Sequence, residues 1–235
     1  MNSRSIAAVS WPLVAALLVV LALQFFVHWR IPRAQAQATD LPDLPSVPLL
    51  RAASLDEPIA LSKMLMLYLQ AFDNQPGVSI PFRDLDYHRV EHWLAQILAL
   101  DPASQYPLLS ASRLYAEVAD AAKQRQMLDF VYRAFLRDPN ARWPWLAHCV
   151  VIAKHRLKDL QLAATYAQAL REHATGKAVP HWAQQMDIFI REDMNEFESA
   201  KILLGGLLQS GQITDPKEWH FLNEKLNQLE QKRSP

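Results

Sequence analysis

The chain has 235 residues, with 24 basic and 24 acidic side chains, 51% hydrophobic residues, 5 glycines and 1 cysteine. This length corresponds to about one or two domains, and the neutral charge balance gives no reason to expect a nucleic-acid partner. A single cysteine excludes an intrachain disulfide and a cysteine-rich zinc site. The low glycine content disfavours glycine-rich phosphate loops and turn-dense β folds, so the composition favours an all-α protein.

An uncharged, apolar stretch runs from Ile6 to Val27 near the start of the chain. About 20 apolar residues are enough to span the hydrocarbon core of a bilayer. Trp11 and Trp29 lie near the two ends of the stretch, where amphipathic rings favour the level of the lipid headgroups. We therefore predict one transmembrane helix over residues 6–29.

The alternative for this stretch is a cleaved signal peptide, with an apolar region over Leu13–Leu23 and a small-residue cleavage site at 34–36 or 36–38. Arg30 and Arg33 lie between the apolar run and either site, which favours a retained anchor. A short head before an apolar run usually stays inside the cell. We therefore expect a bacterial inner-membrane protein with its body in the periplasm.

The next segment, residues 30–54, is rich in proline, with Pro32, Pro42, Pro45 and Pro48. Such a composition is typical of a semi-rigid, extended linker. The linker would hold the body away from the membrane, and its Leu and Val residues could also dock on the body.

Residues 55–235 contain an internal repeat. Asp101-Pro102 recurs 37 residues later as Asp138-Pro139, and Tyr106-Pro107 recurs at the same spacing as Trp143-Pro144. Val179-Pro180 follows after a further 36 residues. Periods of about 20 to 50 residues indicate stacked supersecondary units. We expect Asp-Pro to end one helix and aromatic-Pro to begin the next.

Each unit also carries apolar residues at helical spacing, which mark its second helix. These four stretches are Val90–Leu98, Met127–Phe135, Ala163–Leu170 and Ala200–Leu208. The residues from Trp219 to Leu229 form an amphipathic helix with a polar back, as expected of a cap. At the other end, Ser54 and Glu57 form a possible capping box before a predicted helix over Leu55–Phe72.

These features predict an all-α fold: a right-handed solenoid of about four helix-turn-helix repeats with a C-terminal capping helix, preceded by one transmembrane helix. Lys158–Ala163 and Asn195–Ala200 resemble the turn and the small second-helix residue of tetratricopeptide repeats. The period is longer than about 34 residues, so the resemblance extends to Sel1-like repeats. The whole layout is similar to membrane-anchored repeat proteins of Gram-negative bacteria. The resemblance implies a protein-binding scaffold.

One short motif points to different chemistry. His88, Glu91 and His92 match the His-x-x-Glu-His pattern of inverted zinc metallopeptidases, in which two histidines bind zinc and the glutamate activates water. A catalytic site also needs a third protein ligand. The alternative is a solvated helix edge, because Val90 and Trp93 already face inward. We predict no metal, no cofactor and no enzymatic activity.

Two regions are candidates for partner binding. The loop Asp73–Arg83 is long for a helical body and contains three large apolar residues, Val78, Ile80 and Phe82. Long loops are often functional, although these side chains could simply cap the core. A repeat stack also has a concave face lined by first helices. His148 and Gln184 fall in register there, as do Glu117 and Lys154.

The sequence thus predicts a membrane-anchored protein–protein interaction scaffold or assembly factor of the bacterial cell envelope, without catalysis. A groove would hold an amphipathic segment of a partner from an envelope or membrane complex. The alternatives are a membrane-bound zinc metallohydrolase and a purely structural subunit. Cys149, in the most apolar helix, is expected to be a small buried hydrophobe.

Overall fold

The computed structural model describes residues 10–30, 38–211 and 213–231. Within these ranges the chain forms eleven α-helices, two short 3₁₀ turns and two strands of two residues each. The predicted all-α class is therefore confirmed. The chain divides into two units, one that contains the first helix and one that contains all the others.

Helix α1 (Trp11–Arg30) belongs to the first unit, and its large apolar side chains are exposed from Trp11 to Val27. The part of the chain that the structure describes contains no helix that is long and apolar enough to cross a membrane. The predicted anchor begins at residue 6, outside the described residues, and it stays a prediction. The alternative cleavage sites at 34–36 and 36–38 also fall on residues outside the described ranges.

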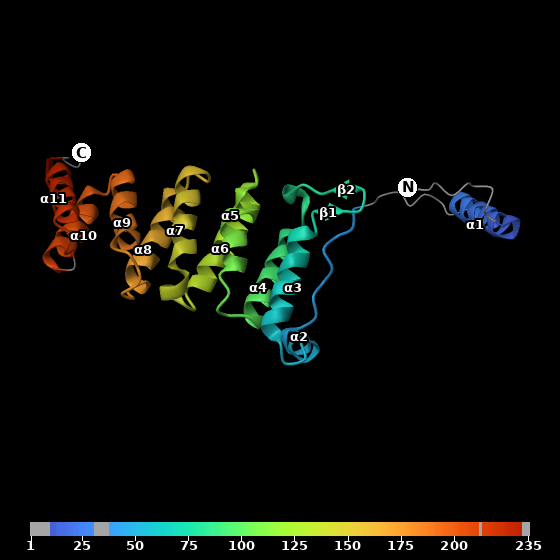
Figure 1. Ribbon diagram of the computed structural model, residues 1–235. Helices are drawn as coiled ribbons and strands as arrows, with labels where there is room; N and C mark the ends of the chain where they lie inside the picture. Colours follow the sequence, from blue (N-terminus) through green and yellow to red (C-terminus); the bar gives the residue numbers. More distant parts are fainter. Residues whose placement is uncertain (1–9, 31–37, 212, 232–235) are drawn as a thin grey trace, which may run out of the picture. The chain divides into compact units, whose positions relative to one another are not determined.

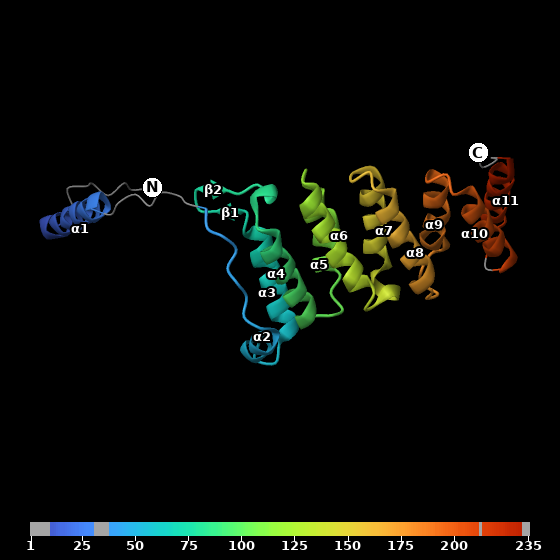
Figure 2. The ribbon, with the colours of Figure 1, turned by 180° about the vertical axis from the view of Figure 1, so that it is seen from behind.

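The second unit is a row of helices that follow one another in chain order from α3 to α11 (Figures 1 and 2). Each of these helices packs against the next, and α4–α6, α5–α7 and α7–α9 are also in contact. The elements are α2 (Val47–Ala53), α3 (Pro58–Ala71), β1 (Asn74–Gln75), β2 (Val78–Ser79), η2 (Phe82–Asp84), α4 (Tyr87–Leu100), α5 (Tyr106–Arg113), η3 (Tyr115–Glu117), α6 (Ala121–Phe135), α7 (Pro139–His155), α8 (Leu160–His173), α9 (His181–Asp193), α10 (Phe197–Gln209) and α11 (Pro216–Gln231).

The four stretches with helical periodicity are α4, α6, α8 and α10, as predicted, and the amphipathic segment after them is α11. An aspartate precedes three of these helices as an N-cap. The carboxylates of Asp86, Asp120 and Asp159 each accept a hydrogen bond of 2.9 Å from a backbone N–H in the first turn. These bonds satisfy donors that have no partner inside the helix, and so they fix where each second helix begins.

The proline signals were interpreted correctly in one repeat and wrongly in the next. Asp101 ends α4 and Tyr106 begins α5, as predicted. Asp138, however, is the N-cap of α7, and Trp143-Pro144 lies inside that helix. Pro139 occupies the first helical position, where its missing N–H costs no hydrogen bond. The helix then continues through Pro144, where one backbone hydrogen bond is lost.

The predicted capping box at Ser54 and Glu57 is also wrong. Ser54 ends α2, and its hydroxyl donates to the Arg51 carbonyl at 2.7 Å. Leu55 and Asp56 adopt φ angles of 50° and 68°, in the left-handed region that breaks a right-handed helix. Helix α3 therefore begins only at Pro58, whose fixed φ suits the first turn.

The proline-rich segment packs on the helices from Leu41 onward, and its residues Val47–Ala53 form helix α2. Leu41 is buried in the main core. The carbonyl of Leu41 accepts a hydrogen bond from Arg89, and that of Pro42 accepts one from Trp93 Nε1 at 2.7 Å. Both donors belong to α4, so these two hydrogen bonds and the buried Leu41 hold this part of the segment against the helices. Residues 31–37 lie outside the described ranges.

The buried residues of the second unit form two clusters. The larger cluster extends from Leu41 and α3 to α9, and its largest fully buried side chains include Tyr115, Tyr166 and Phe135. The smaller cluster joins α9, α10 and α11 through residues such as Ile188, Leu204 and Leu222. Helix α9 is shared between the two, so it connects the central helices to the last pair.

Candidate binding site

Two of the predicted groove residues, His148 and Glu117, come together where η3 meets α7. Burial lowers the pKa of His148, the charge of Arg113 lowers it further, and the charge of Glu117 opposes both. His148 Nε2 is buried and has no hydrogen-bond partner among the described residues. Arg156 Nη1 pairs with Glu117 Oε2 at 2.7 Å. Glu117 is therefore already engaged by a cation of the neighbouring helix.

The other two predicted groove residues also make contacts between elements. Lys154 on α7 pairs with Asp193 at the end of α9. Gln184 Nε2 on α9 donates to the Ala174 carbonyl at 2.8 Å, which ties the loop after α8 to α9. Both side chains join neighbouring elements and do not form one open groove.

The loop residues are divided between the core and the surface. The Ile80 N–H donates to the Asp73 carbonyl at 2.7 Å, and both Ile80 and Phe82 pack against the main core. The ring of Phe82 lies edge-on to Tyr115, with centroids 5.6 Å apart. Val78, in β2, is half-buried. Of the three loop residues, Ile80 and Phe82 therefore cap the main core.

The His-x-x-Glu-His motif lies on α4, and its glutamate is engaged by other side chains. The Glu91 carboxylate accepts hydrogen bonds from Arg133 and from Gln126 Nε2, the second at 2.8 Å. His88 Nδ1 lies 3.2 Å from the same Gln126 amide. Within the described ranges, no group of three or more His, Cys, Asp or Glu side chains is placed to hold a metal ion. A carboxylate paired with Arg133 is poorly suited to activate water.

Cys149 is fully buried in α7, as expected of a small hydrophobe. Burial raises the pKa of its thiol, and the charge of Asp129 adds to the effect. A thiol whose pKa is raised stays protonated and is a poor nucleophile.

The end of α8, the loop after it, α9 and α10 together form a pocket of about 630 Å³. Its apolar wall consists of Val179, Ile188, Ile202, Leu203 and Leu207. Arg171, Lys177 and His181 contribute its basic groups. Among the described residues that line the pocket, none is acidic.

Helix α10 leaves this pocket open. A Cβ atom placed on Gly206 would meet nothing within 4 Å, and the neighbouring Ile202 is exposed. The missing side chain at Gly206 therefore gives access to the half-buried Leu203 and Leu207. Gln184 is the one pocket residue that the sequence identified.

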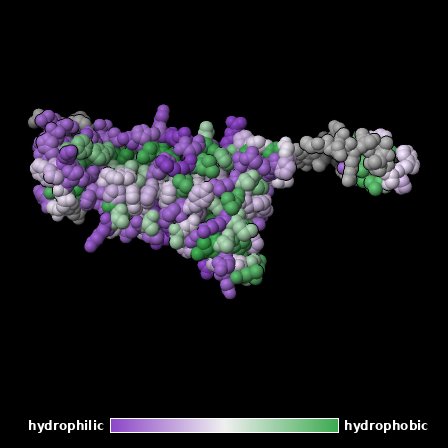
Figure 3. Space-filling model, viewed as in Figure 1, coloured by the Kyte–Doolittle hydropathy of each residue, from purple (hydrophilic) through white to green (hydrophobic). Residues whose placement is uncertain are grey.

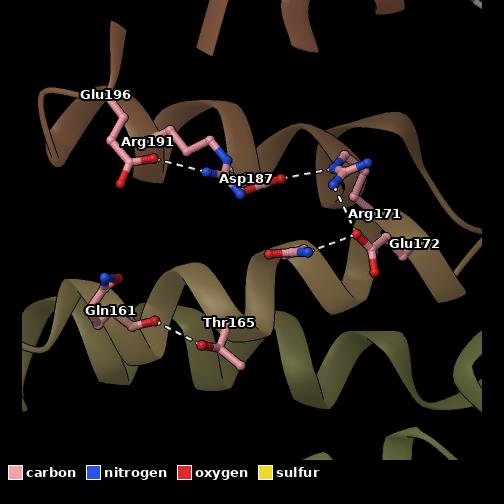
Figure 4. A network of polar contacts seen from close by, with 8 residues as sticks. Gln161, Thr165, Arg171, Glu172, Asp187, Arg191 and Glu196 are labelled. Atoms are coloured by element: carbon pink, nitrogen blue, oxygen red, sulfur yellow. Dashed lines mark hydrogen bonds and ion pairs between the residues drawn. The ribbon is translucent and has the colours of Figure 1, made fainter. Parts of the chain in front are cut away.

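A buried ionic network holds Arg171 at the edge of the pocket (Figure 4). The fully buried carboxylate of Asp187 accepts hydrogen bonds from Arg171 Nε at 2.8 Å and from Arg191 Nε at 2.9 Å. Arg191 also bonds Glu196 at 2.9 Å, and Arg171 bonds Glu172 at 3.1 Å. A buried carboxylate is stable only when it is paired in this way.

The sequence contains one feature from which part of this network could have been predicted. Asp187 follows Ala183 by four residues and precedes Ile188 and Ile190, so it lies among the inward positions of an amphipathic helix. An acidic residue in such a position requires a cation, and Arg191 is four residues further on. Arg171, on another helix, could be identified only in the folded chain.

No protein-family model, no curated protein and no solved structure matches this chain. The resemblance to tetratricopeptide and Sel1-like repeats therefore stays a prediction from the sequence.

Proposed function

We propose that this protein is a non-enzymatic scaffold that binds a partner protein, built as a right-handed, tetratricopeptide-like solenoid. Its repeats are the pairs α3–α4, α5–α6, α7–α8 and α9–α10, with α11 as the cap. The contacts between consecutive helices support this architecture. The observation that carries the function is the pocket between α9 and α10, which combines an apolar wall with basic groups.

The pocket suits a short segment with apolar side chains next to an acidic group. Burial of apolar side chains against Leu203 and Leu207 is favourable by about 25 cal/mol per Å². Lys177 is exposed and makes no ion pair among the described residues, so it is available to a carboxylate of the partner. Arg171 also lines the pocket, and its bonds to Asp187 and Glu172 fix its side chain, so contact with a partner would cost it little further side-chain freedom.

We further propose that the scaffold is anchored in a bacterial inner membrane through residues 6–29, with its repeats in the periplasm. The uncharged stretch from Ile6 to Val27 and its flanking tryptophans support the anchor. Membrane fractions washed with alkaline carbonate should retain the full chain. Protease added to intact spheroplasts should digest the repeats, and protection of the repeats would place them in the cytoplasm.

The binding function is tested by photo-crosslinking in cells that produce the full-length protein. A benzoylphenylalanine residue at the exposed position Ile202 lies beside the pocket. We expect one discrete protein adduct, and we expect Lys177→Glu to reduce it strongly because the reversed charge repels the acidic group of the partner.

Lys217→Glu, the same charge change on exposed α11, is the matched control and should leave the adduct unchanged. A second probe at exposed Phe221, also on α11, tests whether the adduct is specific to the pocket. Absence of an adduct at Ile202, or equal adducts at both probes, would argue against the pocket as the binding site.

A further inference from the structure

Helix α3 keeps an exposed apolar surface. It buries Met66 and Leu69 in the main core. Met64 and Leu67 are 66% and 65% exposed, and Ile59 and Tyr68 are about half exposed, with one side of the Tyr68 ring stacked on Trp93 of α4. We call these four residues the α3 face. The only charged residue in α3 is Lys63.

Exposed apolar side chains continue toward α2. Leu55, between the two helices, is 86% exposed, and Leu49 on α2 is also exposed. In Figure 3 hydrophobic residues gather over α2 and α3. Contiguous apolar surface of this kind on a soluble domain marks a site of interaction.

The two ends of the helix row differ in the polarity of their outer surfaces. Helix α11 buries Leu222 and Leu229, and its surface consists mainly of Lys, Glu, Asn and Gln side chains, with Trp219 and Phe221 as its exposed large apolar residues. Terminal repeats of a solenoid need such a polar outer face to stay soluble. The α3 face lacks it, so the first helix of the row is suited to rest against a further apolar layer.

We propose that this layer is the lipid surface, so that the α3 face lies in the interfacial region of the membrane. The inference rests on the proposed membrane anchor. Only residues 31–37 separate α1 from Ala38, where the second unit begins. Seven residues extend to about 25 Å at most, which keeps the start of the second unit within reach of the bilayer surface.

The side chains of α3 also fit a lipid interface. Tyr68 has an apolar ring and a polar hydroxyl, a combination that favours the headgroup region. Lys63 can bury its methylene chain while its ammonium group reaches the phosphates. No acidic side chain occurs between Pro58 and Ala71, so α3 itself offers no carboxylate to repel anionic headgroups.

The test uses full-length protein inserted singly into nanodiscs of phosphatidylcholine and phosphatidylglycerol. An environment-sensitive NBD fluorophore is attached to Leu67→Cys, and the matched control carries it at Asn227→Cys on exposed α11. Cys149 is fully buried and should not be labelled in the folded protein. Met64→Cys provides an independent second position on the α3 face.

We expect the fluorophore at residue 67 to be blue-shifted and quenched several-fold more strongly by nitroxide-labelled lipid than the one at residue 227. Equal access of both positions to aqueous iodide would overturn the inference. Shielding of residue 67 from iodide and lipid nitroxide alike would also overturn it, because another protein surface would then cover the face.

Failure of the anchor can be separated from failure of this contact. Release of the full chain by alkaline carbonate would contradict both the proposed anchor and the lipid contact. Retention of the chain together with a water-exposed probe at residue 67 would contradict the lipid contact alone.

Discussion

Asp187 is a fully buried carboxylate that pairs with both Arg171 and Arg191. Asp187→Asn removes the charge that pairs Arg171 and Arg191 while it keeps the shape of the side chain. We expect the free energy of unfolding to fall by about 3 kcal/mol, because two partly buried guanidinium groups lose the buried carboxylate that they share and keep only the more exposed Glu172 and Glu196. Urea denaturation followed by circular dichroism measures this change.

Asp193→Asn is the appropriate comparison, because it breaks the more exposed pair with Lys154. Exposed ion pairs contribute about 0.5 kcal/mol or less. Similar losses for the two variants would show that the Asp187 network has no special importance for stability.

His148 should make the stability of the protein depend on pH. Burial lowers its pKa in the folded state, whereas in the unfolded chain it stays near about 6.5. The unfolded state therefore binds more protons once the pH falls through about 6.5, and stability declines from there down to the folded pKa. Urea midpoints at about pH 8 and pH 5 should differ more for the wild type than for His148→Gln.

Because each protein is compared with itself at two pH values, any packing defect of His148→Gln cancels from the comparison. Parallel pH profiles for the two proteins would contradict a protonation effect at this histidine.

At the scale of the element, periodicity predicted the helices well and proline signals predicted their ends less well. The apolar spacing in α4, α6, α8 and α10 reflects burial of one face, which the sequence records directly. Helix starts depend on which of several prolines occupies the first turn. In α7 the start was expected at Trp143-Pro144, but Pro139 begins the helix because Asp138 caps it.

Pro144 should therefore be a stabilising site for substitution. Pro144→Ala restores an N–H in the interior of α7 and removes a ring that crowds the preceding turn. We expect a gain of about 1 kcal/mol, seen as a higher melting temperature. Pro139→Ala, at the first helical position, serves as the control and should give little gain. A larger gain at 139 than at 144 would contradict this account of α7.

Of the features at the scale of the element, the candidate site was the least predictable from the sequence. His148 and Lys154 lie on α7 and Gln184 on α9, whereas Glu117 lies in the 3₁₀ turn η3. The bonding partners of Glu117, Lys154 and Gln184 are 10 or more residues away in sequence. The pocket depends on how the loop after α8 approaches Gly206, and no periodic pattern records that approach. The sequence alone therefore did not predict the contacts between residues that are far apart along the chain.

At the scale of the whole second unit, stability should be uneven along the row. The cluster that joins α9, α10 and α11 contains far fewer buried residues than the main cluster. In a stack where each repeat contacts mainly its neighbours, stability is set locally. Amide hydrogen exchange in α10 and α11 should therefore be faster than in α4, α6 and α8.

Leu222→Ala, in the smaller cluster, should accelerate exchange in α10 and α11 and leave α4 to α8 unchanged. A uniform acceleration across all helices would indicate that the row unfolds as a single cooperative unit.

The consecutive packing of α3 to α11 also has a mechanical consequence. If the chain is held at its start and pulled by a partner at the pocket, the helix interfaces between α3 and α10 carry the load one after another, and α11 lies beyond the loaded part. Among these interfaces, the one between α9 and α10, which belongs to the smaller buried cluster, should then separate first. Because the pocket lies across that interface, tension on the partner would open the pocket that binds it.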